Sequence, residues 1–221
     1  LHLLSRRQRQ MCIRDSFQDM GSYAWAAPYV DLLYEAGVIT GTGGQRYRPA
    51  DAVSRGDFML MLYRAFQLTP ASGAGFPDVP PGSYYAQAIQ AARAAGIASG
   101  YPDGGFHPQE PVTRQDAMVL LERTMQATGW SLGAANTGYL SGFRDGGMVA
   151  PYAQEAMSHM IEYGIITGTP EQKLNPIQSI SRAEMAVMLA RAITFKRIQR
   201  PPGHSGNTMA GGPFAFYGLI V

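Results

Sequence analysis

The sequence predicts an all-α fold made of three tandem helix–loop–helix units. The first observation is a pentapeptide that recurs as VSRGD at 53–57, VTRQD at 112–116 and ISRAE at 180–184. The second is that a Phe-x-Asp string, a glycine and a proline recur with nearly the same spacing. The third is that apolar residues follow helical spacing, whereas nothing in these segments alternates as a strand does. Such a period is typical of a repeat protein, here with units of about fifty residues.

The repeats divide the chain into units at 17–68, 76–128 and 143–194, with a leader at 1–16 and a tail at 195–221. The whole chain has 221 residues, of which 46% are hydrophobic and 15% charged, so it has the material for a packed core. It has no apolar run of membrane-spanning length. Its one cysteine, Cys12, excludes a disulfide scaffold.

We interpret residues 1–16 as a non-native or disordered leader. They are basic but lack the apolar stretch and cleavage site of a signal peptide, and RRQRQMCIRDS resembles translated sequencing-adapter read-through. The tail from Pro201 is rich in glycine and proline and ends in FAFYGLIV. This pattern is typical of a linker leading into a further domain, so we expect the chain to be a fragment.

The net charge of +2 is not spread over the repeats. Of the 18 basic residues, four lie in 1–16 and three in 195–221, and of the 16 acidic residues one lies in 1–16. The repeats therefore carry 11 basic and 15 acidic side chains, a net charge of −4. A nucleic-acid binder normally has a basic field over its folded body, so we expect no nucleic-acid partner and only locally built anion sites.

The first helix of each unit is predicted from apolar spacing and from a terminating glycine. In unit one, Val30, Leu33 and Tyr34 share a predicted apolar face, and Gly37 provides the stop signal. Loops of equal length follow at 41–49, 100–108 and 168–176, and each ends in a proline. Two positions before the proline stands a large apolar residue that we expect to anchor the loop in the core: Tyr47, Phe106 and Leu174.

The second helix of each unit begins at the pentapeptide. Its Ser or Thr and the acid three positions later form a capping-box pattern, which gives the helix-capping residues Ser54, Asp57, Thr113, Asp116, Ser181 and Glu184. The predicted core faces are Phe58, Met61, Leu62 and Ala65, then Ala117, Leu120, Leu121 and Thr124, then Met185, Met188, Leu189 and Ala192. Glu122 is assigned to the helix surface.

Arg55, Arg114 and Arg182 occupy the first position of these helices, where the helix dipole disfavours a positive charge. Capping does not explain them. A guanidinium beside free backbone N–H groups is a good receptor for a carboxylate or phosphate. The alternative is a structural ion pair with an acid of a neighbouring unit.

Other recurring residues also have two interpretations. Trp25, Tyr84 and Tyr152 lie twelve positions before the glycine, either as core or as exposed rings on which a sugar stacks. Asp19, Asp78 and Asp145 of the Phe-x-Asp strings either form turns or contact the ligand. Tyr101 and Asp103 of the second loop complete the candidate ligand-binding set. The histidines are scattered and no catalytic motif is present, so we expect no enzyme, no cofactor and no metal site.

The repeated pattern resembles the S-layer homology (SLH) domain. WAAPYVDLLYEAGVITG at 25–41, GYPDGGFHPQEPVTRQDAM at 100–118 and ISRAEMAVMLARAI at 180–193 carry the resemblance. It implies a pseudo-threefold bundle with grooves between units. It also implies a secreted bacterial cell-surface module, not inserted in a membrane, that anchors its protein non-covalently to a cell-wall polysaccharide. In many members of the family this is a secondary polymer that bears pyruvylated N-acetylmannosamine. The motif arginine of the family corresponds to Arg55, Arg114 and Arg182.

Departures from the family pattern distinguish the three copies. Copy one has Gly56 at the helix start, and copy three has Gln172 and Lys173 in place of loop glycines, so Arg114 has the most family-like surroundings. Two other functions remain open: a structural module that packs against other surface-layer chains, or the anchor of an enzyme whose catalytic domain lies beyond residue 221.

Overall fold

A computed structural model describes residues 16–73 and 75–199. Six α-helices are described, α2 (Ala27–Glu35), α3 (Arg55–Phe66), α4 (Ala86–Ala94), α5 (Arg114–Ala127), α6 (Gln154–Glu162) and α7 (Arg182–Gln199), together with short 3-10 helices at Gly21–Tyr23, Thr137–Gly142, Gly146–Met148 and Pro151–Ala153. The described part of the chain contains no strand, and the all-α prediction is confirmed. Our interpretations of the leader and of the tail beyond residue 199 concern segments outside the described residues, apart from Ser16.

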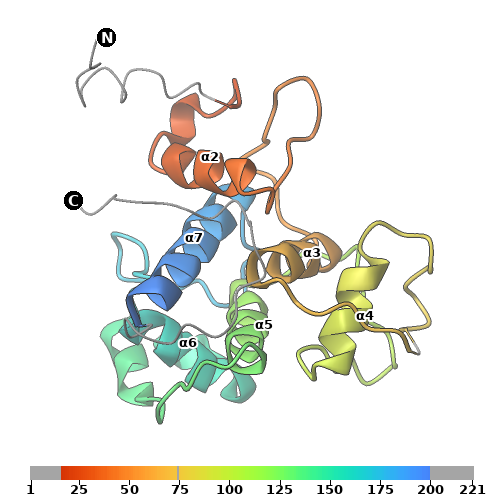
Figure 1. Cartoon of the computed structure of the whole chain (residues 1–221). Helices are drawn as coiled ribbons and strands as arrows, with labels where there is room; N and C mark the ends of the chain where they lie inside the picture. The colour runs from red at the N-terminus through yellow and green to blue at the C-terminus, as the bar shows by residue number, and fades with distance from the viewer. Residues whose placement is uncertain (1–15, 74, 200–221) are drawn as a thin grey trace.

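The helices form a ring in which each unit packs on the next. The second helices α3, α5 and α7 meet at the centre, and the first helices α2, α4 and α6 lie around them (Figure 1). The closest helix pairs join neighbouring units: α3 packs on α4, α5 on α6, and α7 on α2 of the first unit. Because the last pair closes the ring, the three tandem copies form a pseudo-threefold bundle.

Backbone hydrogen bonds between the three units mark the centre of this ring. The amide of Val53 donates to the carbonyl of Ile180 at 3.0 Å, that of Ile180 to Val112 at 3.1 Å, and that of Val112 back to Val53 at 2.9 Å. The three side chains are buried. Each unit therefore contributes one donor and one acceptor to a closed triangle, and none of the three can complete it alone.

The central triangle predicts a contrast between two nearby isoleucines of unit three. Ile180→Ala removes a side chain that is 1% exposed, whereas Ile177→Ala removes one that is 56% exposed. We expect Ile180→Ala to lower the free energy of unfolding by about 2–5 kcal/mol and Ile177→Ala by less than about 0.5 kcal/mol. Urea unfolding followed by circular dichroism checks this, and equal losses would contradict the placement of Ile180 at the centre.

The predicted core faces are buried, with two exceptions. Ala65 is half-buried, and the prediction for Tyr34 is wrong because its side chain is 46% exposed and meets only the edge of Phe17. The assignment of Glu122 to the surface is also wrong, since this carboxylate is buried against His159. Helical spacing finds the inner stripe but places residues at its margin poorly.

The Phe-x-Asp strings recur because their phenylalanines pack on the loop glycines. At Gly100, with φ +79°, an added Cβ would lie 2.6 Å from the ring of Phe76, and no larger residue fits. Gln172 takes the position of Gly104, and both have a positive φ, so the third loop keeps the fold of the second. All three loops are closed by an equivalent backbone hydrogen bond, in which an amide donates to the carbonyl four residues later. The pairs are Thr42 with Arg46, Tyr101 with Gly105, and Thr169 with Lys173.

Candidate functional site

The N-termini of the second helices are capped by the neighbouring unit. The amide of Arg55 donates to the carbonyl of Glu110 at 2.9 Å, and that of Gly56 to the carbonyl of Pro108 at 2.9 Å. The equivalent amides of α5 donate to Gln178 and Pro176, and those of α7 to Asp51 and Pro49. The expectation of free backbone N–H groups beside the arginines is therefore wrong, because neighbouring units meet at the helix starts. Anion binding has to come from the guanidinium groups.

The N-cap hydroxyls complete this arrangement. Ser54, Thr113 and Ser181 each accept a hydrogen bond from the amide three residues later, at 3.1, 3.2 and 3.3 Å. Among the three units, only in unit three does the acid accept a hydrogen bond from the amide of the N-cap residue: Glu184 accepts from the amide of Ser181 at 2.9 Å. The shorter Asp57 and Asp116 instead accept from tyrosine hydroxyls of the next unit.

The Arg55 site lies where α3 meets the loop of unit two. Arg55 is 8% exposed, its Nε donates to the carbonyl of Phe106 at 3.0 Å, and its guanidinium lies 4.6 Å from the ring centroid of Tyr101 and 5.0 Å from that of Phe106. Neither Nη atom bonds to a described residue, and neither is sealed from solvent. No carboxylate of the described residues forms an ion pair with this guanidinium.

Two further groups border the Arg55 site. The hydroxyl of Tyr152, from unit three, donates to Asp116 at 2.7 Å. Burial raises the pKa of Tyr101, the Arg55 guanidinium lowers it, and the nearby Asp116 raises it. The charges of Arg55 and Asp116 therefore both lie near the side chain of Tyr101. Burial and the bond to Asp116 raise the pKa of Tyr152 to about 12, so its hydroxyl keeps its proton at neutral pH. All three units thus contribute to one site.

The Arg182 site repeats this geometry between units three and one. The Nε of Arg182 donates to the carbonyl of Tyr47 at 2.8 Å, one Nη donates to Thr40 at 3.0 Å, and the guanidinium lies 4.5 Å from the Tyr47 ring centroid. The Tyr84 hydroxyl donates to Asp57 at 2.7 Å. Burial and Asp57 raise the pKa of Tyr84 to about 12, while Arg182 lowers it, which places all three groups in one neighbourhood. Among the described residues Arg182 has no carboxylate partner.

The Arg114 site is different. Its guanidinium forms an ion pair with Glu184, and its Nε, although buried, has no partner among the described residues. Burial raises the pKa of Glu184, but Arg114 and the Ser181 amide and hydroxyl outweigh burial, so the pKa lies below its ordinary value of 4.5. Of the two interpretations given above for the arginines, the ion pair with a neighbouring unit describes Arg114.

The three recurring aromatic residues are exposed, so their interpretation as core is wrong. Trp25, Tyr84 and Tyr152 are 53%, 67% and 59% exposed. Each lies two residues before the first α-helix of its unit, and Tyr84 and Tyr152 each lie beside the acid of the preceding unit. Their ring faces are therefore available beside the Arg182 and Arg55 sites. Stacking of a sugar on them stays a prediction.

The aspartates of the Phe-x-Asp strings hold the loops. Asp78 accepts from the amides of Phe106 at 2.9 Å and His107 at 2.7 Å. Asp19 binds the amides of Tyr47 and Arg48 in the same way, and Asp145 those of Leu174 and Asn175. Their turn-forming role explains why they recur, since each fixes the loop of its own unit, and the loops held by Asp78 and Asp19 contact Arg55 and Arg182. Contact of these carboxylates with a ligand stays a prediction.

Asp103 also acts within its own loop. It accepts from the amide of Gly105 at 2.9 Å and pairs with His107 at 2.7 Å. The Gly105 amide chiefly lowers the pKa of Asp103, and the hydrogen bond to Asp103 chiefly raises that of His107. Tyr101, two residues earlier, contacts Arg55 from the same loop, as Phe106 does.

The aspartate contacts predict a pH dependence of stability. Burial raises the pKa of Asp78, but the hydrogen bonds from the amides of Phe106 and His107 together lower it by more. The pKa of Asp78 therefore lies below its ordinary value of 3.8. The stabilisation is thus complete above pH 3.8 and is lost as pH falls through the folded-state pKa. We expect Asp78→Asn to cost about 1–2 kcal/mol at pH 7, a modest value because solvent screens this carboxylate. Denaturation at pH 7 and pH 2 checks this, and a loss that is equal at both would contradict it.

Sequence reasoning missed the residues that hold the side chains of Arg55 and Arg182. Tyr47 and Phe106 were assigned to the core, and both are buried, but each also offers a ring and a carbonyl to an arginine of the preceding unit in the ring. The recurring aromatic residue two positions before the proline was the available signal. Its partner is not visible in the sequence because it lies in another unit, and for Tyr47 it lies 135 residues away.

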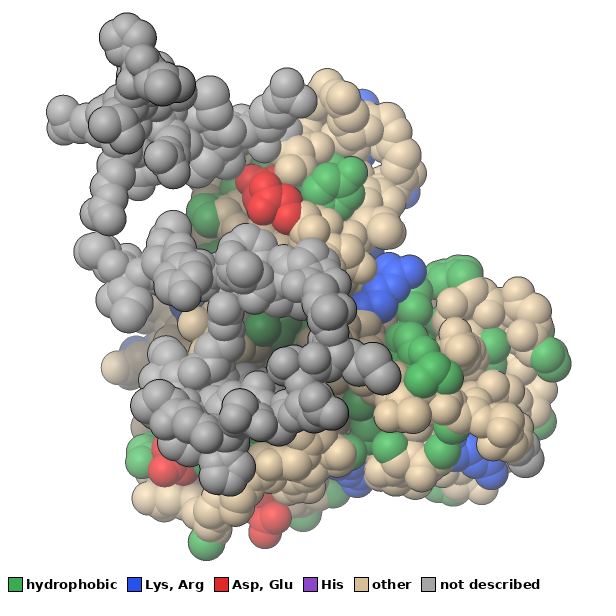
Figure 2. All heavy atoms as spheres, viewed as in Figure 1, with side chains coloured by type: hydrophobic (Ala, Val, Ile, Leu, Met, Phe, Trp, Pro, Cys, Tyr) green, Lys and Arg blue, Asp and Glu red, His purple; other side chains and the backbone are tan. Residues whose placement is uncertain are grey.

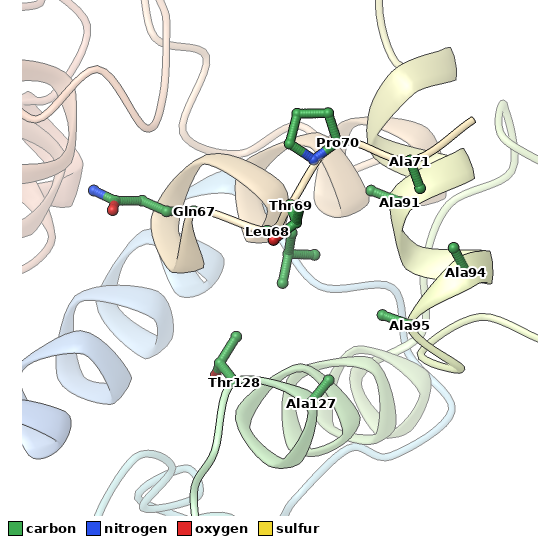
Figure 3. Close-up of a pocket in the computed structure, with 10 residues that line it drawn as sticks. All are labelled: Gln67, Leu68, Thr69, Pro70, Ala71, Ala91, Ala94, Ala95, Ala127 and Thr128. Atoms are coloured by element: carbon green, nitrogen blue, oxygen red, sulfur yellow. The ribbon is translucent and has the colours of Figure 1, made fainter. Parts of the chain in front are cut away.

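A separate hollow lies at the other end of the second helices. This pocket of about 490 Å³ is lined by residues 67–71, which follow α3, by the small residues Ala91, Ala94 and Ala95, and by the end of α5 (Figure 3). Since α3 has 12 residues, the pocket lies about 18 Å along the helix from Arg55. None of its lining residues is charged.

The surface and the helices show three further properties. On the face in Figure 2, charged side chains are scattered among hydrophobic ones. Within 16–73 and 75–199, no helix has both the length and the apolar character to cross a bilayer. The same residues hold no group of three or more His, Cys, Asp or Glu side chains suited to a metal ion.

Comparison with known proteins gives one family and several relatives. The model of the S-layer homology domain matches residues 16–59, 75–118 and 142–186. An endoglucanase of Bacillus sp. (strain KSM-635) is 28% identical over 79% of this chain and 18% of its own length. The surface-layer 125 kDa protein of Lysinibacillus sphaericus is 29% identical over 81% of this chain and 15% of its own. The S-layer protein of Bacillus thuringiensis subsp. finitimus is 25% identical over 80% of this chain and 21% of its own.

A closed ring of three repeats with an arginine at each junction is the architecture of a tandem-repeat binding module. Each of the three matched segments begins one residue before a predicted unit and ends within its second helix, and the chain belongs to the S-layer homology domain family. Modules of this family bind cell-wall polymers, and the chain is a cell-surface anchoring module. It spans only a fifth or so of the length of the three relatives, so the rest of those proteins has no counterpart in it.

Proposed function

We propose that the chain anchors its parent protein to the bacterial cell wall by binding an anionic, pyruvylated secondary wall polysaccharide. The observation that supports this most is the pair of guanidinium groups at Arg55, which is buried, and Arg182, which is partly buried; neither has a carboxylate partner among the described residues. A buried charge without a counter-ion is costly, and an acidic group from outside would lower that cost. A ketal carboxylate on a sugar is such a group.

The surroundings of these arginines favour a sugar acid over a simple ion. Exposed tyrosines border both sites, and an aromatic ring face suits the C–H face of a pyranose. Their protonated hydroxyls and the aspartates add polar partners for sugar hydroxyl groups. Several weak sites on one chain gain further from a polymer that carries many copies of the same sugar.

The test is a calorimetric titration of residues 16–199 with purified wall polysaccharide before and after chemical removal of its pyruvate. Saturable binding that is lost with the pyruvate supports the proposal. Equal binding by both preparations would refute the role of the ketal carboxylate, and no binding by either would refute the anchoring proposal itself.

We also propose that this segment is secreted and has no catalytic role of its own. The endoglucanase relative supports this, because this chain matches only 18% of it and therefore corresponds to a small part of that enzyme. The surface-layer relatives keep assembly with other surface-layer chains as a second candidate function. Light scattering separates the two, since assembly without wall polysaccharide favours the structural role.

A further inference from the structure

The three arginine sites differ in whether a carboxylate of the protein already occupies them. At Arg55 and Arg182 the guanidinium is seated on a backbone carbonyl and an aromatic ring and has no acidic partner among the described residues. At Arg114 it is paired with Glu184, and only 16% of the Arg114 side chain is exposed. The interaction that an acidic sugar would make is already made there by the protein.

Arg114 lacks two contacts that Arg55 and Arg182 have. Leu174 stands where Tyr47 and Phe106 offer a ring, so the Arg114 guanidinium has no aromatic face to lie on. Its Nε also lacks the carbonyl partner that Arg55 and Arg182 have. Deprived of both contacts, the guanidinium extends to the carboxylate of Glu184.

The length and surroundings of the acid explain why Glu184 reaches the arginine. Glutamate is one methylene longer than Asp57 and Asp116, which are held away by hydroxyls of Tyr84 and Tyr152. At the equivalent position Trp25 has no hydroxyl, and within the described residues no hydrogen bond joins it to Glu184. One oxygen of Glu184 is fixed by Ser181, which leaves the other for Arg114.

We propose that Glu184 acts as an internal ligand of Arg114, so that this site is closed and the module holds its acidic ligand at two sites, those of Arg55 and Arg182. The inference rests on the function proposed above and specifies which junctions of the ring perform it. It reverses the order expected from the sequence, in which Arg114 has the most family-like motif. The specificity-determining residues are Glu184, Leu174 and Trp25, all at the junction between units three and one or in the loop of unit three.

The test follows the Nε–H NMR signals of the arginines during titration with a synthetic N-acetylmannosamine that carries a pyruvate ketal. The same sugar without pyruvate is the control, and single Arg→Lys variants assign the signals. In the wild-type protein we expect the signals of Arg55 and Arg182 to shift and saturate, while that of Arg114 stays in place. In Glu184→Asp we expect three responding arginines instead of two, most clearly when Leu174→Phe is also present.

Glu184→Asp is a conservative variant because aspartate already occupies this position in units one and two. The reciprocal control places the acid and the aromatic residue of the Arg114 site at the Arg182 site, with Asp57→Glu and Tyr84→Trp. In this variant we expect the Nε–H signal of Arg182 to stay in place during the titration. Equal shifts of all three arginines in the wild-type protein would overturn the inference and leave the proposed function intact. If the Arg114 signal does not shift in Glu184→Asp, with or without Leu174→Phe, then Glu184 is not what closes the Arg114 site. If none of the three arginine signals shifts in the wild-type protein, the proposed function itself is refuted.

Discussion

Replacing both Arg55 and Arg182 by alanine should reduce retention of the protein on purified cell walls to near background. Each guanidinium offers charge-assisted hydrogen bonds worth about 1.5–3 kcal/mol, which corresponds to roughly a 10- to 100-fold loss of affinity for each site. Because a polymer engages both sites at once, loss of both removes the gain from multivalency as well. Co-sedimentation with walls over a range of protein concentrations measures the effect.

The matched control is Arg114→Ala, which removes a guanidinium that is already paired with Glu184. We expect this variant to keep most of its retention, and Arg55→Lys to show whether charge alone suffices without the planar fork. Since the Nε of Arg55 and of Arg182 also binds a loop carbonyl, each variant needs a thermal unfolding curve beside its binding curve. A folded double variant that sediments as the wild type does would exclude these two arginines as the anchor.

The sequence predicts the elements of this fold well because their signals are local. The caps Ser54, Thr113 and Ser181, the apolar spacing and the recurring glycines all act within a dozen residues, and the helices begin where the caps place them. The loops were predicted for the same reason, and their anchors Tyr47, Phe106 and Leu174 are buried.

The candidate site is less predictable because every contact that defines it crosses between units. The sequence identifies Arg55 as an unexplained cation, but its seat on Phe106 depends on which unit follows in the ring. Free amides were expected at the helix starts because an isolated helix has them. In the assembled ring the neighbouring loop supplies the carbonyls. The pairing of Arg114 with Glu184 joins residues 70 positions apart and depends on a difference of one methylene from the other two units.

A chain that ends at residue 142, and so lacks unit three, should fail to fold into a stable structure. The deletion removes α7, on which α2 packs, and α6, on which α5 packs. It also removes the carbonyl of Ile180 that receives the Val53 amide and the amide that binds Val112, so the central triangle is lost. Of the main helix pairs between units, two units alone retain α3 with α4 and α3 with α5 but lose α5 with α6, α7 with α2 and α3 with α7. Repeats that bury their cores on neighbours need those neighbours.

We expect this shortened chain to show reduced helicity and no cooperative thermal transition by circular dichroism. The matched control is a circular permutant that begins at residue 75 and joins residue 199 to residue 16 through a long Gly/Ser linker. It keeps every helix pair and the central triangle, so it should melt cooperatively near the wild-type temperature. A two-unit chain that melts as sharply as the permutant would show that two units are stable without the third. In that case the closed ring would serve only to align the arginine sites, whereas the shared backbone triangle and the helix pairs across units indicate that it also carries the stability of the fold.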